Sequence, residues 1–294
     1  MKKILITGAN SFVGTSFKKW ISQYPEKYSV DTISLRDEKW KETSFEEYDA
    51  VLHTVGIAHV DSNPDPKLES LYYRINRDLT IKTAQKAKNE GVKQFIFMSS
   101  IIVYGDSSRI NETRVININT KPTPANFYGN SKLQAEEGIR LLESNKFKVA
   151  IIRPPMIYGK GSKGNYPKLA KIAKLLPVFP DINNERSMLH IDNLCEILRL
   201  IIDYKDSGIF YPQNEKYVKT SEMVSLISEV NGKKIKLTKF FNPLLGIMSG
   251  KVALINKVFG SLVYDKELSG YKKNYRIRDL KESILETEKN NSYM

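Results

Sequence analysis

The chain has 294 residues, of which 41% are hydrophobic and 27% charged, so it can bury a sizeable core and is not expected to be disordered. Its net charge of +13 suits a solvated basic surface, an anionic ligand or a membrane surface. The lysines are scattered rather than gathered in a compact stripe, which argues against nucleic acid. The single cysteine, Cys195, excludes an intrachain disulfide, so a reducing, cytoplasmic location is expected. No apolar run is long enough to span a bilayer.

Short apolar segments alternate with amphipathic ones through the first 155 residues. Gly91 closes one amphipathic segment, at the position after a helix where glycine costs least. This alternation, without hairpin signals, predicts an α/β fold of the Rossmann type, a doubly wound parallel sheet with helices on both faces. Strands are expected at residues 3–7, 29–35, 49–55, 93–100 and 147–155, and helices at 13–23, 76–91 and 130–145.

After residue 155 the pattern loosens into a glycine-rich loop at 158–168 and a strand–helix pair at 187–203. We therefore expect residues 1–155 to form an NAD(P)-binding domain, joined by a returning segment near 187–214. The remainder of 156–294 is expected to form a smaller substrate-binding lobe. Its apolar stretch 240–264 predicts a helical cap over the substrate pocket, and the alternative is an interfacial contact with a membrane.

The stretch ILITGANSFVGTSF, residues 4–17, predicts a strand, a glycine loop and the start of a helix. Such a loop binds a dinucleotide pyrophosphate, because backbone N–H groups and the helix dipole point at the phosphates. Gly8 and Gly14 match the first and third glycines of the usual pattern, but Ser11 replaces the second. We expect Ser11 to be tolerated and its hydroxyl to donate to a phosphate oxygen. The alternative is a tight turn with no ligand. The expected cofactor contacts in the loop are Gly8, Asn10, Ser11, Phe12, Val13 and Gly14.

The end of the second expected strand reads SLRD, with Arg36 before Asp37. An acidic residue there binds the 2′-hydroxyl of NAD, whereas an arginine accommodates the 2′-phosphate of NADP. Because Arg36 comes first, NADPH is expected in preference to NADH. A shift of one residue in the strand end would reverse this preference.

Ser100, Tyr128 and Lys132 form the candidate catalytic set. Tyr128 and Lys132 are four residues apart at a helix start, hence on one face, and Ser100 follows a buried strand. A lysine ammonium near the phenol is expected to lower the pKa of Tyr128, so that it can exchange a proton with a carbinol oxygen held by Ser100. Each of these residues alone is common by chance. Their order behind the glycine loop is what predicts a site.

These motifs resemble those of the extended short-chain dehydrogenases/reductases, in the NAD-dependent epimerase/dehydratase family. The segments that carry the resemblance are TGANSFVG, DAVLHTVGIAHV, FMSSIIVYG, YGNSK, RPPMIYGKG and RSMLHIDNL. The resemblance implies that Gly56, Asn76, Tyr128, Lys132 and Pro155 lie at the cofactor. It also implies that a UDP-linked sugar meets Ser100, Tyr128, Lys163, Gly164, Asn165 and Arg186.

Two features narrow the activity that the resemblance implies. Family members that eliminate water carry an Asp–Glu pair where this chain has Ile101 and Ile102, and aliphatic side chains cannot transfer protons. Cys195, in an apolar helical segment, is not expected to act in a proton-carrying Cys/His pair. Oxidation or reduction at one carbon remains, in a 4-keto reductase or a 4-epimerase with tightly bound NAD. The second half is similar to bacterial capsule and O-antigen reductases that form UDP-N-acetyl-fucosamine or UDP-N-acetyl-quinovosamine from a UDP-4-keto-6-deoxy-N-acetylhexosamine.

The remaining candidates are three histidines, at positions 53, 59 and 190. We interpret His53 and His190 as structural, and His59 as an equal candidate for a structural residue or a substrate contact. The three are spread along the chain without metal-ligand spacing, so no metal is expected. Because relatives in the family pair through two helices, one of which carries the tyrosine, a homodimer is expected.

Overall fold

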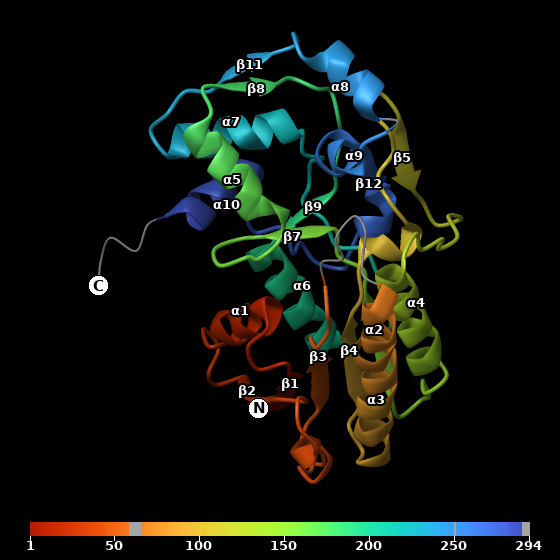
Figure 1. Ribbon diagram of the computed structural model, residues 1–294. Coiled ribbons are helices and arrows are strands. Elements are labelled where there is room, and N and C mark those ends of the chain that lie inside the picture. Colours follow the sequence, from red (N-terminus) through yellow and green to blue (C-terminus); the bar gives the residue numbers. More distant parts are fainter. Residues whose placement is uncertain (59–65, 250, 290–294) are drawn as a thin grey trace.

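The computed structural model describes residues 1–58, 66–249 and 251–289, and its centre is a sheet of six parallel strands (Figure 1). The strand order is β10-β6-β4-β3-β1-β2. The predicted parallel α/β sheet is therefore confirmed. The strands are β1 Lys2–Thr7, β2 Tyr28–Ile33, β3 Ala50–His53, β4 Gln94–Met98, β6 Lys148–Ile152 and β10 Gly208–Phe210.

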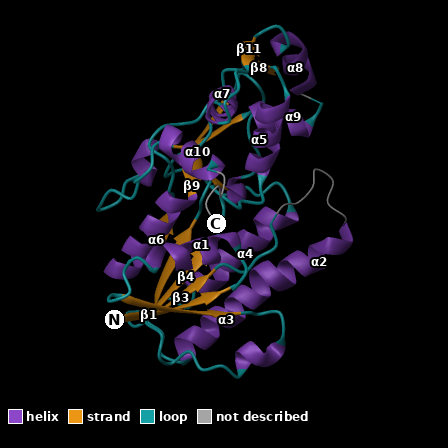
Figure 2. Ribbon diagram, turned by 90° about the vertical axis from the view of Figure 1, so that its left-hand side faces the viewer, coloured by secondary structure: helices purple, strands orange, loops and turns teal. Residues whose placement is uncertain are grey.

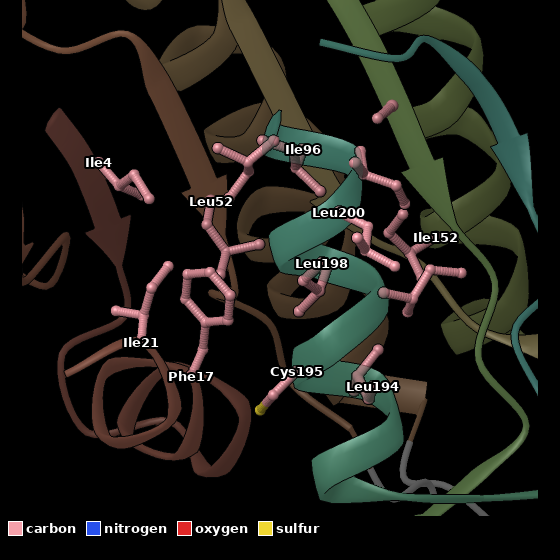
Figure 3. Close-up of a cluster of buried hydrophobic side chains, with 14 of the residues drawn as sticks. Ile4, Phe17, Ile21, Leu52, Ile96, Ile152, Leu194, Cys195, Leu198 and Leu200 are labelled. Carbon is pink, nitrogen blue, oxygen red and sulfur yellow. The ribbon is translucent and has the colours of Figure 1, made fainter. Parts of the chain in front are cut away.

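Helices cover both faces of this sheet because the strand side chains alternate between two apolar cores. In β1, Ile4 and Ile6 belong to one core and Leu5 to the other. The first core lies under α1 and α6, and Figure 3 shows side chains of this core from the two helices, Cys195 among them, and from the strands. The second core lies under α3 and α4. The helices are α1 Phe12–Ile21, α3 Leu79–Asn89, α4 Phe127–Arg140 and α6 Ile191–Tyr204.

The helix expected at 76–91 begins earlier and is not regular. It starts as α2, Glu69–Tyr72, passes through a π-helical turn, Tyr73–Asp78, and continues as α3. A π turn inserts one extra residue, and such insertions are frequent at functional sites. Here it contains the buried Asn76, whose side chain bonds the loop after β3. The other end agrees with the prediction, since Gly91 has a φ of +81° just beyond the helix.

The order of the strands reverses at β1, which has β2 on one side and β3 on the other. In open α/β sheets, ligands bind in the crevice beyond the carboxyl ends of the strands at such a switch point. The loops that leave β1 and β3 contain the glycine loop and Gly56. The fold therefore brings two separately predicted motifs to the switch point of the sheet.

The second half of the chain builds a smaller lobe beside the sheet (Figures 1 and 2). Its core lies among α5, α7, α9 and α10, and three pairs of short parallel strands surround it. The lobe helices are α5 Asn165–Leu175, α7 Thr220–Val230, α8 Asn242–Ser249, α9 Ala253–Phe259 and α10 Leu280–Glu288. The strand pairs are β7 Met156–Tyr158 with β9 Met188–His190, β8 Val178–Pro180 with β11 Lys236–Thr238, and β5 Thr113–Ile116 with β12 Ser261–Tyr264.

The chain crosses between the sheet and the lobe in both directions. The segment near 187–214 returns to the sheet, where α6 packs on one face and β10 pairs with β6. In the opposite direction, β5 leaves the first half to pair with β12. The division at residue 155 remains a prediction, and β5 is an element that it did not anticipate.

The apolar stretch 240–264 forms α8, α9 and the buried strand β12. The prediction that it caps the substrate pocket does not hold for α8, whose residues Leu244 and Ile247 are exposed. The reason is that α8 contacts the lobe through only one of its sides, on which Leu245 packs against the lobe core.

Candidate active site

The glycine loop has the backbone that a dinucleotide site requires. Gly8 adopts a φ of +92°, and a Cβ there would lie 2.8 Å from Oγ1 of Thr54. A Cβ on Gly14 would lie 2.7 Å from Oγ of Ser11 and 3.0 Å from Ile6, so Gly14 allows α1 to approach β1. Both positions match the roles predicted for the first and third glycines.

Ser11 explains how the loop tolerates a residue other than glycine at its middle position. Its φ of −73° and ψ of 146° are open to any L-residue. Its Oγ caps α1 by accepting a hydrogen bond from the Gly14 N–H at 2.9 Å, and it lies 2.6 Å from Oγ1 of Thr54. The Thr54 hydroxyl donates to the Thr7 carbonyl, which can only accept, so Ser11 donates to Thr54. The expectation that Ser11 donates to a phosphate is therefore wrong, because its one proton is already used.

The N-terminus of α1 leaves backbone donors for an anion. Phe12 and Val13 are its first residues, and the first turn contains no acidic side chain. The N–H groups of such residues have no partner within the helix, and the helix dipole is positive there. Asn10 is exposed in the loop just before them. These residues could hold a pyrophosphate through their backbone.

Arg36 and Asp37 differ in how they are engaged after β2. Arg36 is exposed, and only its backbone N–H enters a described hydrogen bond, to Ser34. The Asp37 carboxylate caps a short 3₁₀ turn by accepting from the Lys39 N–H at 3.1 Å. Of these two residues, Arg36 is therefore the one whose side chain is available to a cofactor phosphate.

The loop after β3 is held against Lys132. A Cβ on Gly56 would lie 2.9 Å from Nζ of Lys132 and 3.1 Å from Oδ1 of Asn76. Asn76 accepts from the Ile57 N–H at 2.8 Å and donates to the Ile57 carbonyl and to Ser131, each at 3.1 Å. The amide of Asn76 is thus occupied in holding the loop. A side chain at Gly56 would force the Lys132 ammonium to move from its present position.

Ser100, Tyr128 and Lys132 come together at the carboxyl end of β4. Ser100 follows β4 and caps the next 3₁₀ turn, Tyr128 lies in the first turn of α4, and Lys132 follows one turn later. A hydrogen bond joins Ser100 to Tyr128. The ammonium of Lys132 donates to the Met98 carbonyl at 2.9 Å and lies 4.6 Å from the centre of the Phe97 ring.

The proton affinities of this site differ from the prediction. Burial raises the pKa of Tyr128 to about 12, and the hydrogen bond with Ser100 opposes this only in part. The expected lowering by Lys132 is absent because that ammonium is directed at Met98. Burial also lowers the pKa of Lys132 to about 8, against the attraction of Glu136. At neutral pH Tyr128 therefore carries its proton and can act as a general acid.

A buried ionic network beneath Lys132 was not anticipated from the sequence. Glu136 pairs with the guanidinium of Arg153, and both side chains are almost fully buried. Ser99 donates to the same carboxylate, and Arg153 also donates to the Tyr104 hydroxyl at 2.6 Å. The sequence did offer a signal for this pair. Glu136 follows Lys132 by one helical turn, and Arg153 lies at the end of a buried strand, so two opposite charges fall in segments that are expected to be buried.

The predicted substrate residues other than Ser100 and Tyr128 lie on the lobe. Arg186 donates to the Gly260 carbonyl at 2.9 Å, and burial lowers its pKa to about 10. No carboxylate pairs with it within the described residues, which suits an anionic ligand. Lys163 and Asn165 are exposed around Gly164 at the N-terminus of α5. No described bond joins them to Arg186. Pro155 is buried three residues after the end of β6, and the carbonyl of its neighbour Pro154 accepts a hydrogen bond from the Ile101 N–H.

His53 is structural, as predicted. Thr80 donates to the Asn76 carbonyl, so its oxygen accepts from Nε2 of His53, and Nδ1 accepts from Thr7. Burial lowers the pKa of this neutral ring to about 3. The prediction for His190 is also confirmed, since it is buried and caps α6. His59 lies outside the described residues.

The comparisons agree with this architecture. A relative named UDP-glucose 4-epimerase, from Vibrio cholerae, is 29% identical over 92% of this chain and 90% of its own length. A second, from Escherichia coli O157:H7, is named N-acetyl-alpha-D-glucosaminyl-diphospho-ditrans,octacis-undecaprenol 4-epimerase. It is 27% identical over 84% of this chain and 77% of its own.

Solved structures share the fold over nearly the whole chain. A dTDP-4-dehydrorhamnose reductase from Clostridium acetobutylicum superposes with a TM-score of 0.73 at 19% identity, covering 97% of this chain and 98% of its own. A UDP-N-acetylglucosamine 4-epimerase from Bacillus cereus gives 0.75 at 15% identity, with 98% of each chain covered. Residues 4–212 match the sequence pattern of one family, and on this evidence the chain belongs to the NAD dependent epimerase/dehydratase family.

Proposed function

We propose that the protein reduces the 4-keto group of a UDP-linked 4-keto-6-deoxy-N-acetylhexosamine with NADPH. The observation that carries this proposal is the group of Ser100, Tyr128 and Lys132, which lies against the loop that follows β3, near the switch point of the sheet. Burial keeps Tyr128 protonated at neutral pH, as a reduction requires of the residue that protonates the new alkoxide.

In the proposed reaction each residue has one task. Bound NADPH would supply the hydride that C4 receives. Tyr128 gives its proton to the C4 oxygen, and Ser100 holds that oxygen by a hydrogen bond. Lys132 supplies positive charge next to Gly56, where a nicotinamide ribose would lie. The aliphatic Ile101 and Ile102 follow Ser100, so no acid–base pair for eliminating water adjoins the serine.

The cofactor preference rests on Arg36. Its exposed guanidinium can meet the 2′-phosphate of NADPH, while the carboxylate of Asp37 is bound to the Lys39 backbone. Phe12 and Val13 would hold the pyrophosphate through their backbone N–H groups.

The substrate class rests on Arg186 and the start of α5. The half-buried guanidinium of Arg186 has no carboxylate partner in the described chain, which suits a diphosphate. Lys163, Gly164 and Asn165 offer a second cationic point at a helix N-terminus. Both curated relatives carry names of enzymes that act on diphosphate-linked sugars. The proposed product is UDP-N-acetyl-fucosamine or its C4 epimer UDP-N-acetyl-quinovosamine, for a surface polysaccharide.

The second candidate is a 4-epimerase with tightly bound NAD, favoured by the names of both curated relatives. It needs the same three catalytic residues but no net reduction. Such an enzyme would purify with NAD, released on denaturation, and would interconvert sugars that lack a 4-keto group. Chromatography of the denatured supernatant therefore separates the two candidates.

The test of the proposal is oxidation of NADPH, followed by absorbance, when the purified protein receives the UDP-4-keto sugar, with NADH run alongside. Tyr128→Phe should lower kcat by about 10²–10⁴-fold and leave NADPH binding intact, because only the proton donor is lost. The matched control is Tyr73→Phe. It removes the hydroxyl of a tyrosine in the π-helical turn before α3, which accepts a hydrogen bond from Asn130. Full turnover by Tyr128→Phe would overturn the assignment.

We also propose that the protein forms a homodimer through α4, which carries Tyr128, and a neighbouring helix. Light scattering of the protein eluting from a sizing column tests this directly. A mass of twice 33.7 kDa supports the dimer, and a mass of 33.7 kDa contradicts it.

A further inference from the structure

One helix of the lobe presents an apolar face to solvent. We call the side chains of Phe240, Phe241, Leu244, Ile247 and Met248 the α8 face. Phe240 is 82% exposed, Leu244 58% and Ile247 72%. Phe240, Leu244 and Ile247 recur at helical spacing and so line one side of the helix and its entry. A cluster of this kind on a surface marks an interaction site.

The lobe fixes the direction in which this face points. On the opposite side of α8, Leu245 packs against the lobe core, and Ser249 accepts a hydrogen bond from the Ile110 N–H at 3.1 Å. Asn242 donates to the Asp181 carbonyl at 2.9 Å. Figures 1 and 2 both place α8 at the end of the molecule farthest from the six-stranded sheet. The α8 face can therefore meet a flat partner without hindrance from the sheet.

The charge around this face has one sign. Residues 230–264 contain six lysines and no aspartate or glutamate. Lys239 and Lys251 flank α8 and are exposed. The carboxylate of Asp181, which also feels the charge of Lys239, pairs with Lys219 at 2.7 Å. An apolar stripe whose own segment carries cations and no carboxylate is complementary to a surface that offers both hydrocarbon and negative charge.

We propose that the α8 face docks on the surface of an anionic lipid bilayer, with α8 lying in the interface. An eight-residue helix is about 12 Å long, too short to cross a bilayer. None of the helices within residues 1–58, 66–249 and 251–289 has the length and apolarity needed to cross one. A second copy of the chain suits this face less well, because two sets of flanking lysines would meet in a symmetric contact. The inference does not depend on the proposed reaction.

The test is co-sedimentation of the full chain with two kinds of vesicle. One is made of phosphatidylcholine alone, and the other also contains about 30% phosphatidylglycerol, which gives its surface a negative charge. We expect binding to the anionic vesicles that weakens with salt. The triple variant Phe240→Ser/Leu244→Ser/Ile247→Ser should bind at least about tenfold less, because its apolar contact is lost. Lys239→Gln/Lys251→Gln should lower binding by about fivefold for each lysine.

Matched controls separate this face from general stickiness. Leu141→Ser/Leu175→Ser removes two exposed leucines elsewhere, and Lys18→Gln/Lys19→Gln removes two exposed lysines of α1. Both controls should bind vesicles as the unchanged protein does. Equal binding by the triple variant, or no binding by the unchanged protein, would overturn the proposal. Dissociation of a dimer by the triple variant, without vesicle binding, would assign the face to a second copy and also overturn it.

Discussion

At the scale of single residues, Arg36 decides the choice of cofactor. Arg36→Ala should weaken NADPH binding by about tenfold or more and leave NADH binding unchanged, because a hydrogen bond to a charged group contributes about 1.5–3 kcal/mol. Fluorescence titration of both cofactors measures this, with Lys39→Ala as the control for an exposed cation nearby. Equal weakening of both cofactors would contradict the role given to Arg36.

A second residue-scale prediction concerns Glu136 and the pH profile. The pKa of Lys132 is about 8, and the Glu136 charge opposes the lowering by burial. If the Lys132 cation is needed, kcat/KM should fall as pH rises through about 8, since this constant reports pKa values of the free enzyme. Glu136→Gln removes the opposing charge, so the fall should move to lower pH.

Two further variants make that experiment decisive. Glu137→Gln changes the exposed neighbour and should leave the profile unchanged. Glu136→Gln should also destabilise the fold by about 3 kcal/mol or more, because it leaves Arg153 buried without its partner. Glu136→Asp keeps the negative charge but shortens the side chain. It shows whether the pH shift of Glu136→Gln comes from the lost charge or from altered packing at this site. A profile that Glu136→Gln leaves in place would exclude the coupling.

The roles of these residues were only partly predictable from sequence. Ser100, Tyr128 and Lys132 were found because their spacing on a helix start and a strand end is local information. The pKa of Tyr128 was predicted in the wrong direction, because it depends on burial and on the Met98 carbonyl that takes the Lys132 ammonium. Contacts of that kind join residues far apart in the sequence.

At the scale of elements, the start of α1 depends on Ser11. Ser11→Ala removes the cap and should lower the free energy of unfolding by about 1 kcal/mol, whereas Ser11→Gly should cost only a few tenths. Neither variant should lose the dinucleotide, since the backbone N–H groups of Phe12 and Val13 remain. Urea unfolding and a cofactor titration test the two parts. Loss of cofactor binding in both variants would show that the hydroxyl meets the phosphate after all.

Element boundaries followed the sequence where the pattern was strong. The alternating segments predicted five of the six strands of the sheet within a few residues, and the short edge strand β10 was not predicted. The π turn before α3 was missed because it depends on the tertiary bonds of Asn76 to Ile57 and Ser131. The strand β5 was missed because its partner β12 lies far along the chain, and four residues give no pattern by themselves.

At the scale of the whole molecule, the sheet brings the glycine loop, Gly56 and the end of β4 to one edge. The later part of the chain returns to this sheet, where α6 packs on one face and β10 adds an edge strand. The parallel class could be predicted from alternation alone. The strand order could not, because it depends on which strands pair and not on their local sequence. The same holds for the α8 face, whose exposure follows from how the lobe packs.

The most direct test of the central claim is the transfer of deuterium from 4-deuterated NADPH to the sugar. The protein is given the UDP-4-keto sugar with each stereoisomer of the labelled cofactor, and the product is analysed by NMR. The proposed reductase should place deuterium at C4 from one of the two stereoisomers, with one NADP formed for each product molecule. If the labelled NADPH stays unchanged and no reduced sugar forms, the reductase is contradicted. Interconversion of UDP-sugars that carry a 4-hydroxyl group, without added NADPH, would then favour an epimerase with its own bound NAD.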